Sequence, residues 1–222
     1  MAAPISIYLE FGAKRTFAGA LEWPGWCRSG RIEAAALEAL SAYAPRYLAA
    51  VGPGSGFVAP DSPTALAVVQ RLSGDAGTDF GVPSVPPSAD ATTIEGPELE
   101  RWLDVMEAAW EAFERAACAA GEVPLTVGPR GGGRQTAAIR EHVLGAEEGY
   151  LNRLGRSRGW PEGADGLDPR QLVRRCVMAR ARGETPPPGR RTAPLWSVRS
   201  FIRRATWHVL DHAWEIEDRT VG

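Results

Sequence analysis

This 222-residue chain contains very little lysine and histidine. Lys14 is the only lysine, so every other strongly basic side chain is an arginine. Together with abundant alanine and glycine, this bias is typical of a high-GC bacterial genome. Only three histidines occur, so a function that needs imidazole has few residues from which to build its site.

Cysteine and long apolar runs are also scarce. The three cysteines, Cys27, Cys118 and Cys176, are far apart and include no Cys-x-x-Cys spacing. This pattern disfavours a disulfide framework and favours a reducing cytosol. Residues 1–11 lack the basic start and apolar stretch of a secretory signal. No segment approaches the roughly 20 apolar residues of a membrane helix. We therefore expect a cytoplasmic protein with no membrane partner.

The net charge of −2 is unevenly distributed between the two parts of the chain. Residues 1–128 carry −8 and residues 129–222 carry +6. Such asymmetry can indicate an anionic partner for the second part. The alternative is that the two parts attract each other or present solvated helix faces. Nucleic-acid binding needs a known motif or a basic face with interleaved aromatic residues. Neither is present, so we expect no nucleic-acid partner.

The first part of the chain combines strand and helix patterns. Residues 5–11 and 15–21 are rich in β-forming residues around a short glycine-containing turn, which predicts a β-hairpin. Residues 32–48 are rich in alanine and leucine at helical spacing, which predicts one helix. Two weaker strands are expected at residues 67–72 and 78–82.

A proline-rich stretch separates this part from the rest. Residues 83–90 contain three prolines and two serines and are predicted to form a linker. We therefore expect a small α+β domain at residues 1–95 and a second domain at residues 96–222.

The second part has the period of amphipathic helices. Helices are predicted over residues 98–120, 135–154, 168–182 and 196–219. The glycine-rich stretch 128–133 lacks the Gly-Lys-Ser/Thr ending of a phosphate-binding loop, so it is interpreted as a linker. The predicted fold class is α+β, with a small N-terminal β-hairpin and helix domain followed by a C-terminal four-helix bundle.

All three histidines fall on inward faces of the predicted helices. His208 and His212 are four residues apart, which brings both imidazoles to one helix face. His142 lies on an apolar stripe between Ile139 and Ala146. Three neutral imidazoles suit zinc, nickel, copper or iron and leave a coordination position open. The alternative is a chance His-x-x-x-His spacing together with a core histidine bonded to a carbonyl.

Several charged residues are further candidates. Asp211 and Glu215 flank the histidine pair, and they are predicted either to orient an imidazole or to carry protons in catalysis. The alternative for both is a solvated carboxylate. Arginines of the last two helices are candidates to hold a substrate carboxylate, and most are expected at the surface: Arg170, Arg174, Arg175, Arg180, Arg182, Arg203 and Arg204.

The C-terminal part resembles the DinB/YfiT-like superfamily over residues 97–219. The matching residues are Glu141-His142-Val-Leu-Gly-Ala-Glu147, followed by Tyr150 and Leu151, and the later His208-Val-Leu-Asp-His212. Members include thiol-dependent transferases and mycothiol-dependent maleylpyruvate isomerases. They are four-helix bundles that bind a divalent metal through one histidine of the second helix and a late His-x-x-x-His pair. The resemblance implies a metal, zinc before nickel or iron, on His142, His208 and His212.

Residues 5–48 have a weaker likeness to HicB-type antitoxin folds. It rests on two strands, the segment Pro24-Gly25-Trp-Cys27-Arg-Ser-Gly30 and a helix that opens near Glu33. In those proteins this part contacts a partner protein, but the chain has no recognisable DNA-binding tail of that family. We expect a lid or interface for the bundle, with an extra packing domain as the alternative.

These observations predict a metal-dependent transferase or isomerase that uses a small-molecule thiol and an electrophile. The alternative is a non-enzymatic interaction protein with a structural metal or none, whose N-terminal half binds a partner protein. Assembly into a homodimer stays open.

Overall fold

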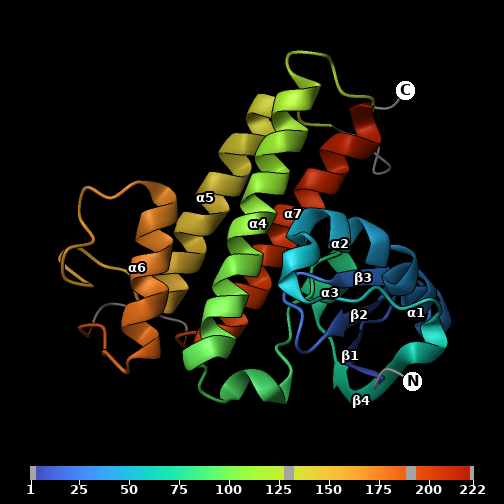
Figure 1. Ribbon diagram of the computed structural model, residues 1–222, viewed down its shortest axis with the longest axis horizontal. Helices are drawn as coiled ribbons and strands as arrows, with labels where there is room; N and C mark the ends of the chain where they lie inside the picture. Colours follow the sequence, from blue (N-terminus) through green and yellow to red (C-terminus); the bar gives the residue numbers. More distant parts are fainter. Residues whose placement is uncertain (1–3, 128–132, 189–193, 221–222) are drawn as a thin grey trace.

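The chain has the α+β architecture predicted from its sequence. The computed structural model describes residues 4–127, 133–188 and 194–220. Strands from the first third of the chain form one sheet, and long helices from the remainder stand beside it (Figure 1). Most of the stretch 128–133, predicted as a linker, lies outside the described residues. Within the described ranges no helix is long and apolar enough to cross a bilayer.

The sheet has four strands in the order β3-β2-β1-β4. β1 (Ile5–Phe11) and β2 (Thr16–Ala20) form the predicted antiparallel hairpin. β3 (Cys27–Gly30), which the sequence pattern did not indicate, pairs antiparallel with β2. β4 (Leu66–Ser73) confirms the strand predicted at residues 67–72 and pairs parallel with β1.

The crossover to β4 contains two helices where the sequence predicted one over residues 32–48. α1 (Glu33–Ala42) ends at Tyr43, and α2 (Ala44–Val51) has Pro45 in its first turn. Proline lacks an N–H, and its ring clashes with the carbonyl four residues earlier. A single helix therefore cannot run straight through Pro45, and the prediction of one helix was wrong.

The strand predicted at residues 78–82 is also wrong. This region contains a short helix, α3 (Ala76–Phe80). The Asp75 side chain accepts hydrogen bonds from the backbone N–H groups of Gly77 and Thr78, and the Thr78 hydroxyl accepts one from the backbone N–H of Asp75. This reciprocal capping satisfies donors that a helix start leaves free, and it outweighs the weak strand preference.

The segment predicted as a linker at residues 83–90 is anchored at both ends. The backbone N–H of Ser84 donates to the Glu10 carboxylate of β1 at 3.0 Å. At the other end, the Asp90 side chain accepts hydrogen bonds from Arg203. This stretch therefore packs across the molecule between the sheet and the helices.

The long helices match the four predicted from helical periodicity. They are α4 (Gly96–Ala120), α5 (Thr136–Leu154), α6 (Pro169–Ala181) and α7 (Val198–Thr220). α6 begins as expected, with the Asp168 side chain accepting from a backbone N–H of the first turn and proline at the first helical position. α7 packs against both α4 and α5, and α6 lies on the outer side of α5 (Figure 1).

One hydrophobic core extends across the predicted boundary between residues 95 and 96. Ile7 and Leu9 of the sheet and Tyr47 of α2 belong to the same buried cluster as the apolar stripe of α4. The buried residues of that stripe include Leu99, Trp102, Leu103, Met106, Trp110 and Phe113. The segments 1–95 and 96–222 therefore share a core, although α4 begins at the predicted boundary.

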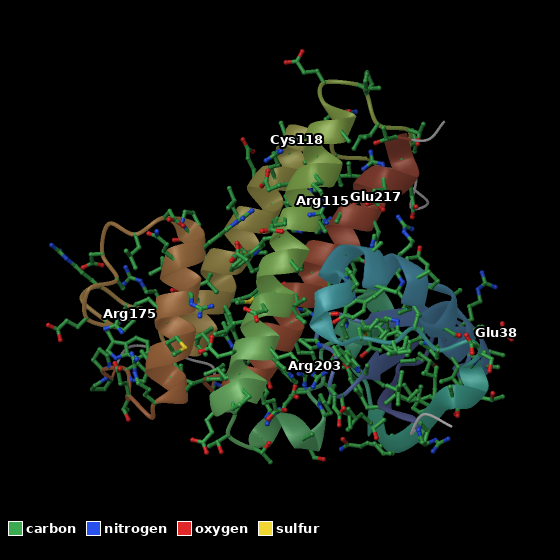
Figure 2. The ribbon with its side chains drawn as sticks, in the orientation of Figure 1. Glu38, Arg115, Cys118, Arg175, Arg203 and Glu217 are labelled. Atoms are coloured by element: carbon green, nitrogen blue, oxygen red, sulfur yellow. The ribbon has the colours of Figure 1, made fainter. Side chains whose placement is uncertain are left out.

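A buried ion pair holds α7 against the first segment. Arg203 is 7% exposed and Asp90 is 1% exposed, and Nη2 of Arg203 lies 2.8 Å from Oδ1 of Asp90. Other donors of Arg203 reach the carbonyl oxygens of Ala20 and Leu21 at the end of β2. Figure 2 shows Arg203 where the long helices meet the sheet. Because the Arg203 guanidinium contacts both Asp90 and the end of β2, it fixes how α7 lies on the sheet.

Candidate metal centre

The three histidines meet where α5 and α7 pack together. His142 lies in the first half of α5, and His208 and His212 lie one turn apart on α7. One ring nitrogen from each histidine lies within 4.8 Å of the others. The structure thus brings together the set of residues that the sequence singled out.

The spacing of the rings is compatible with shared coordination of one ion. The Nε2 atoms of His142 and His208 are 3.2 Å apart. Two nitrogens bound tetrahedrally to zinc at about 2.05 Å would be separated by about 3.3 Å. The ring planes of the three pairs are inclined by 61° to 85°, so the imidazoles converge without stacking. The donor set and the spacing of the His142–His208 pair therefore fit a transition-metal ion, and the third ring nitrogen lies within 4.8 Å of this pair.

A carboxylate orients the His212 ring. Nδ1 of His212 lies 2.7 Å from Oε2 of Glu215, and Nη1 of Arg219 donates to Oε1 of Glu215 at 2.7 Å. The hydrogen bond with His212 comes first among the causes that hold the pKa of Glu215 below its usual value, followed by contributions from Arg219. A charged carboxylate on Nδ1 keeps the proton there, which leaves Nε2 with a free lone pair.

His208 lacks the partner that an ordinary core histidine would have. It is 7% exposed, and its Nδ1 is buried without a hydrogen-bond partner. Its other nitrogen faces His142. Within the described residues, therefore, neither ring nitrogen bonds a backbone carbonyl. Orphaned buried polar atoms are uncommon, and an ion bound to Nε2 would leave Nδ1 as the protonated nitrogen, still without an acceptor among the described residues.

The electrostatic surroundings keep the imidazoles of His208 and His142 neutral. Burial, reinforced by repulsion from the charged forms of His212 and His142, lowers the pKa of His208 to about 2. Burial also lowers the pKa of His142, and His212 and Arg134 act in the same direction. Histidine binds metal in its neutral form, so these residues are prepared as ligands at physiological pH.

The site has an open side. No carboxylate or thiol of the described chain joins the three ring nitrogens as a fourth ligand. His142 and His212 are only half-buried, so solvent reaches the cluster. Three protein ligands with a free position are typical of catalytic rather than structural zinc sites.

The two predicted carboxylates have different surroundings. Glu215 contacts His212, as its predicted orienting role requires. Asp211 instead pairs with Arg28 of β3, with Nη1 and Oδ1 2.9 Å apart. The guanidinium of Arg28 also lies over the ring of Tyr43 at 4.0 Å. Asp211 thus contributes to the contact between α7 and the N-terminal segment, and a catalytic role for either carboxylate remains a prediction.

The arginines proposed as carboxylate clamps are mostly on the surface. On α6, Arg170 and Arg174 pair with Glu107 and Glu100 of α4 at 3.2 and 2.9 Å. These side chains are exposed, so the pairs contribute little to stability. Among these proposed clamps, Arg204 is the one whose positive charge contributes to the lowered pKa of His208.

Two neighbours of the site were not singled out as functional from the sequence. Tyr150, known only as part of the quoted motif, has its ring centroid 5.6 Å from that of His208. Arg219 supports Glu215, and its position four residues later on one helix is the signal that could have identified it. No comparable local spacing connects Tyr150 to His208, because they come from different helices.

No protein family, curated protein or solved structure matches this chain. The likenesses of residues 97–219 to the DinB/YfiT-like superfamily and of residues 5–48 to HicB-type antitoxins therefore remain predictions from sequence motifs.

Proposed function

We propose that the chain binds one divalent transition-metal ion through His142, His208 and His212, zinc in preference to nickel or iron. The observation that carries this proposal is the convergence of three ring nitrogens within 4.8 Å, with no fourth protein ligand among the described residues. Neutral imidazoles favour these ions over magnesium and calcium. The carboxylate of Glu215 supports the proposal because ligating histidines commonly donate their second ring nitrogen to such a group.

We propose further that the protein is a metal-dependent transferase or isomerase of the DinB-like class that uses a small-molecule thiol. In this proposal α4, α5, α6 and α7 form the four-helix bundle of that class. When bound, the ion would lower the pKa of a thiol in the open position, so that a thiolate persists at neutral pH. The half-buried rings of His142 and His212 border the side from which a thiol can enter, and Glu215 holds the His212 ring in place.

The N-terminal segment is proposed to serve as an interface for the helices. Its shared core with α4 and the Arg203–Asp90 pair support this role. The alternative function, an interaction protein whose N-terminal half binds a partner, would instead need a free surface on that half and would not need an open metal position.

The first test is the metal content of the purified full-length protein and its variants. His208→Ala and His212→Ala should each remove most of the metal, because each deletes one of three ligands. Asp211→Asn is the matched control: it removes a charge next to His212 on the same helix, but that carboxylate binds Arg28. Metal loss in Asp211→Asn equal to that in His212→Ala would contradict the assignment.

The second test addresses the reaction. Metal-loaded protein, chelated protein and His142→Ala are assayed with a panel of small thiols and electrophiles, and circular dichroism reports the fold. Thiol transfer or isomerisation by the loaded protein alone supports the proposal. Unfolding on chelation would assign the ion a structural role and favour the interaction-protein alternative.

A further inference from the structure

A cavity of about 130 Å³ lies between the sheet, the segment 83–90 and α7. Its apolar walls include Trp196, Trp207, Pro83 and Pro86. A cavity of about 150 Å³ with apolar walls can hold a benzene molecule. The space therefore suits a ligand whose body is about the size of one six-membered ring.

Arg204 brings an unneutralised positive charge to this cavity. Its side chain is half-buried and lines the cavity. Nη1 donates to the carbonyl oxygen of Pro83 and Nε donates to the hydroxyl of Tyr150, both neutral acceptors. The guanidinium also lies over the rings of Trp207 and Tyr150, at 4.9 and 5.6 Å. In the part of the chain that the structure describes, no carboxylate forms an ion pair with it.

Arg203, the residue before Arg204, differs in that its charge is neutralised. Arg203 also lines the cavity, but Asp90 neutralises it through a bidentate contact. Charges removed from water are ordinarily paired, because an unpaired one keeps its desolvation cost without compensation. A guanidinium has five N–H donors, and the hydrogen bonds of Arg204 account for only two of them. An anion at Arg204 would supply both the missing charge and acceptors for the remaining donors.

We propose that this cavity binds a small organic monocarboxylate, with the carboxylate on Arg204 and the apolar body against Trp196 and Trp207. The planar fork of arginine matches a carboxylate in a bidentate contact. The largely apolar walls favour an organic acid over inorganic phosphate or sulfate, which have no apolar surface to bury.

The other polar groups of the cavity fit a binding role. Burial, with a smaller contribution from Glu10, raises the pKa of Cys27 to about 12, so its thiol stays protonated and offers no nucleophile. Burial likewise raises the pKa of Tyr8, so its hydroxyl stays neutral. The negative charge of Asp90 is taken up by Arg203. No unpaired negative charge of the described residues lining the cavity therefore opposes an anionic ligand.

Tyr150 connects the cavity with the histidine site. Its hydroxyl accepts from Arg204, and its ring lies 5.4 Å from that of Trp196 and 5.6 Å from that of His208 between centroids. The cavity is thus connected to the proposed metal centre through Tyr150, and a carboxylate ligand whose body carries an electrophilic group would serve there as the substrate of the thiol. That role rests on the proposed function, whereas the binding of the carboxylate does not.

Calorimetric titration of benzoate into full-length protein, freed of metal by chelation and dialysis, tests the binding. Benzamide and benzylamine are the neutral and cationic probes of the same ring size, and inorganic phosphate is the anion without an apolar body. Benzoate is expected to bind at least about tenfold more tightly than benzamide and benzylamine, which cannot form the charge-assisted contact with Arg204. It is expected to exceed phosphate by a similar factor, because phosphate has no apolar surface to bury against the walls.

Two variants locate the site, and one serves as the control. Arg204→Gln should weaken benzoate binding at least about tenfold. Arg174→Gln removes the same charge from an exposed position on α6 and should change it less than about twofold. Ser200→Leu leaves Arg204 in place but fills part of the cavity that Ser200 lines. Ser200→Leu should abolish benzoate binding, and it tests the location of the site if Arg204→Gln does not fold.

Equal binding of benzoate and benzamide, or phosphate binding as tight as benzoate, would overturn the assignment of an organic carboxylate. Benzoate binding unchanged in a folded Arg204→Gln or in Ser200→Leu would overturn the location. Because the protein is metal-free, the result is separate from the metal centre. Benzoate binding by a protein that takes up no zinc would support the cavity assignment and refute the proposed function. Zinc uptake by a protein that does not bind benzoate would refute only the assignment of the cavity.

Discussion

The Arg203–Asp90 pair offers a quantitative test of how the two segments are held together. Asp90→Ala would leave the Arg203 guanidinium, 7% exposed, with the carbonyl oxygens of Ala20 and Leu21 as its acceptors but without a counter-charge. Removing one member of a buried pair costs about 3–5 kcal/mol, because the other charge stays buried and uncompensated. We expect the free energy of unfolding to fall by that amount.

Urea denaturation followed by circular dichroism measures the effect. With a denaturant slope of about 2–3 kcal/mol/M, the midpoint should fall by about 1–2.5 M. Asp218→Ala is the control, since it breaks an ion pair with Arg46 in which the aspartate side chain is 55% exposed. Such pairs are worth less than about 1 kcal/mol. An equal, small loss in both variants would refute the view that the buried pair holds α7 on the sheet.

Three further predictions concern charge and metal. Burial raises the pKa of Glu147 to about 7, although it accepts a hydrogen bond from Trp110 and lies near Arg170. Because the folded pKa is above the unfolded value near 4.5, stability should fall by up to about 3 kcal/mol as the pH rises from 4.5 to 7. Glu147→Gln should remove this fall in denaturation curves, and an unchanged pH profile would count against it. Glu215→Gln should weaken zinc affinity about 10- to 100-fold in chelator competition, because His212 loses its charged partner; an unchanged affinity would contradict the orienting role. Chelation should abolish thiol-transfer activity but leave the helical circular dichroism signal, since the core is large and built without the ion; a lost signal would make the ion structural.

The long helices and the metal ligands were accessible from sequence because their signals are local. Helical periodicity depends on neighbours three and four residues apart, and it placed α4, α5, α6 and α7 to within about two residues. The spacing of His208 and His212 fixes their common face in the same way. His142 could be assigned to an apolar face, but its meeting with the pair depends on how α5 packs against α7.

Other features depend on contacts that local patterns do not encode. Arg203 and Asp90 are 113 positions apart, so neither the buried pair nor the shared core was visible in the sequence. The cavity beside Arg204 has the same origin, because its walls come from distant segments. The two wrong predictions of secondary structure have causes in the local sequence. Capping by Asp75 favours a helix where a strand was predicted, and Pro45 interrupts the helix predicted over residues 32–48.

The metal content of the full-length protein after native purification tests the central claim most directly. Elemental analysis should find about one equivalent of zinc or a neighbouring transition metal per chain, and chelated protein should regain it with a rise in melting temperature, because binding to the folded state stabilises it. Protein that carries no transition metal, and whose melting temperature does not change when zinc is added, would contradict the assignment of His142, His208 and His212 as a metal centre.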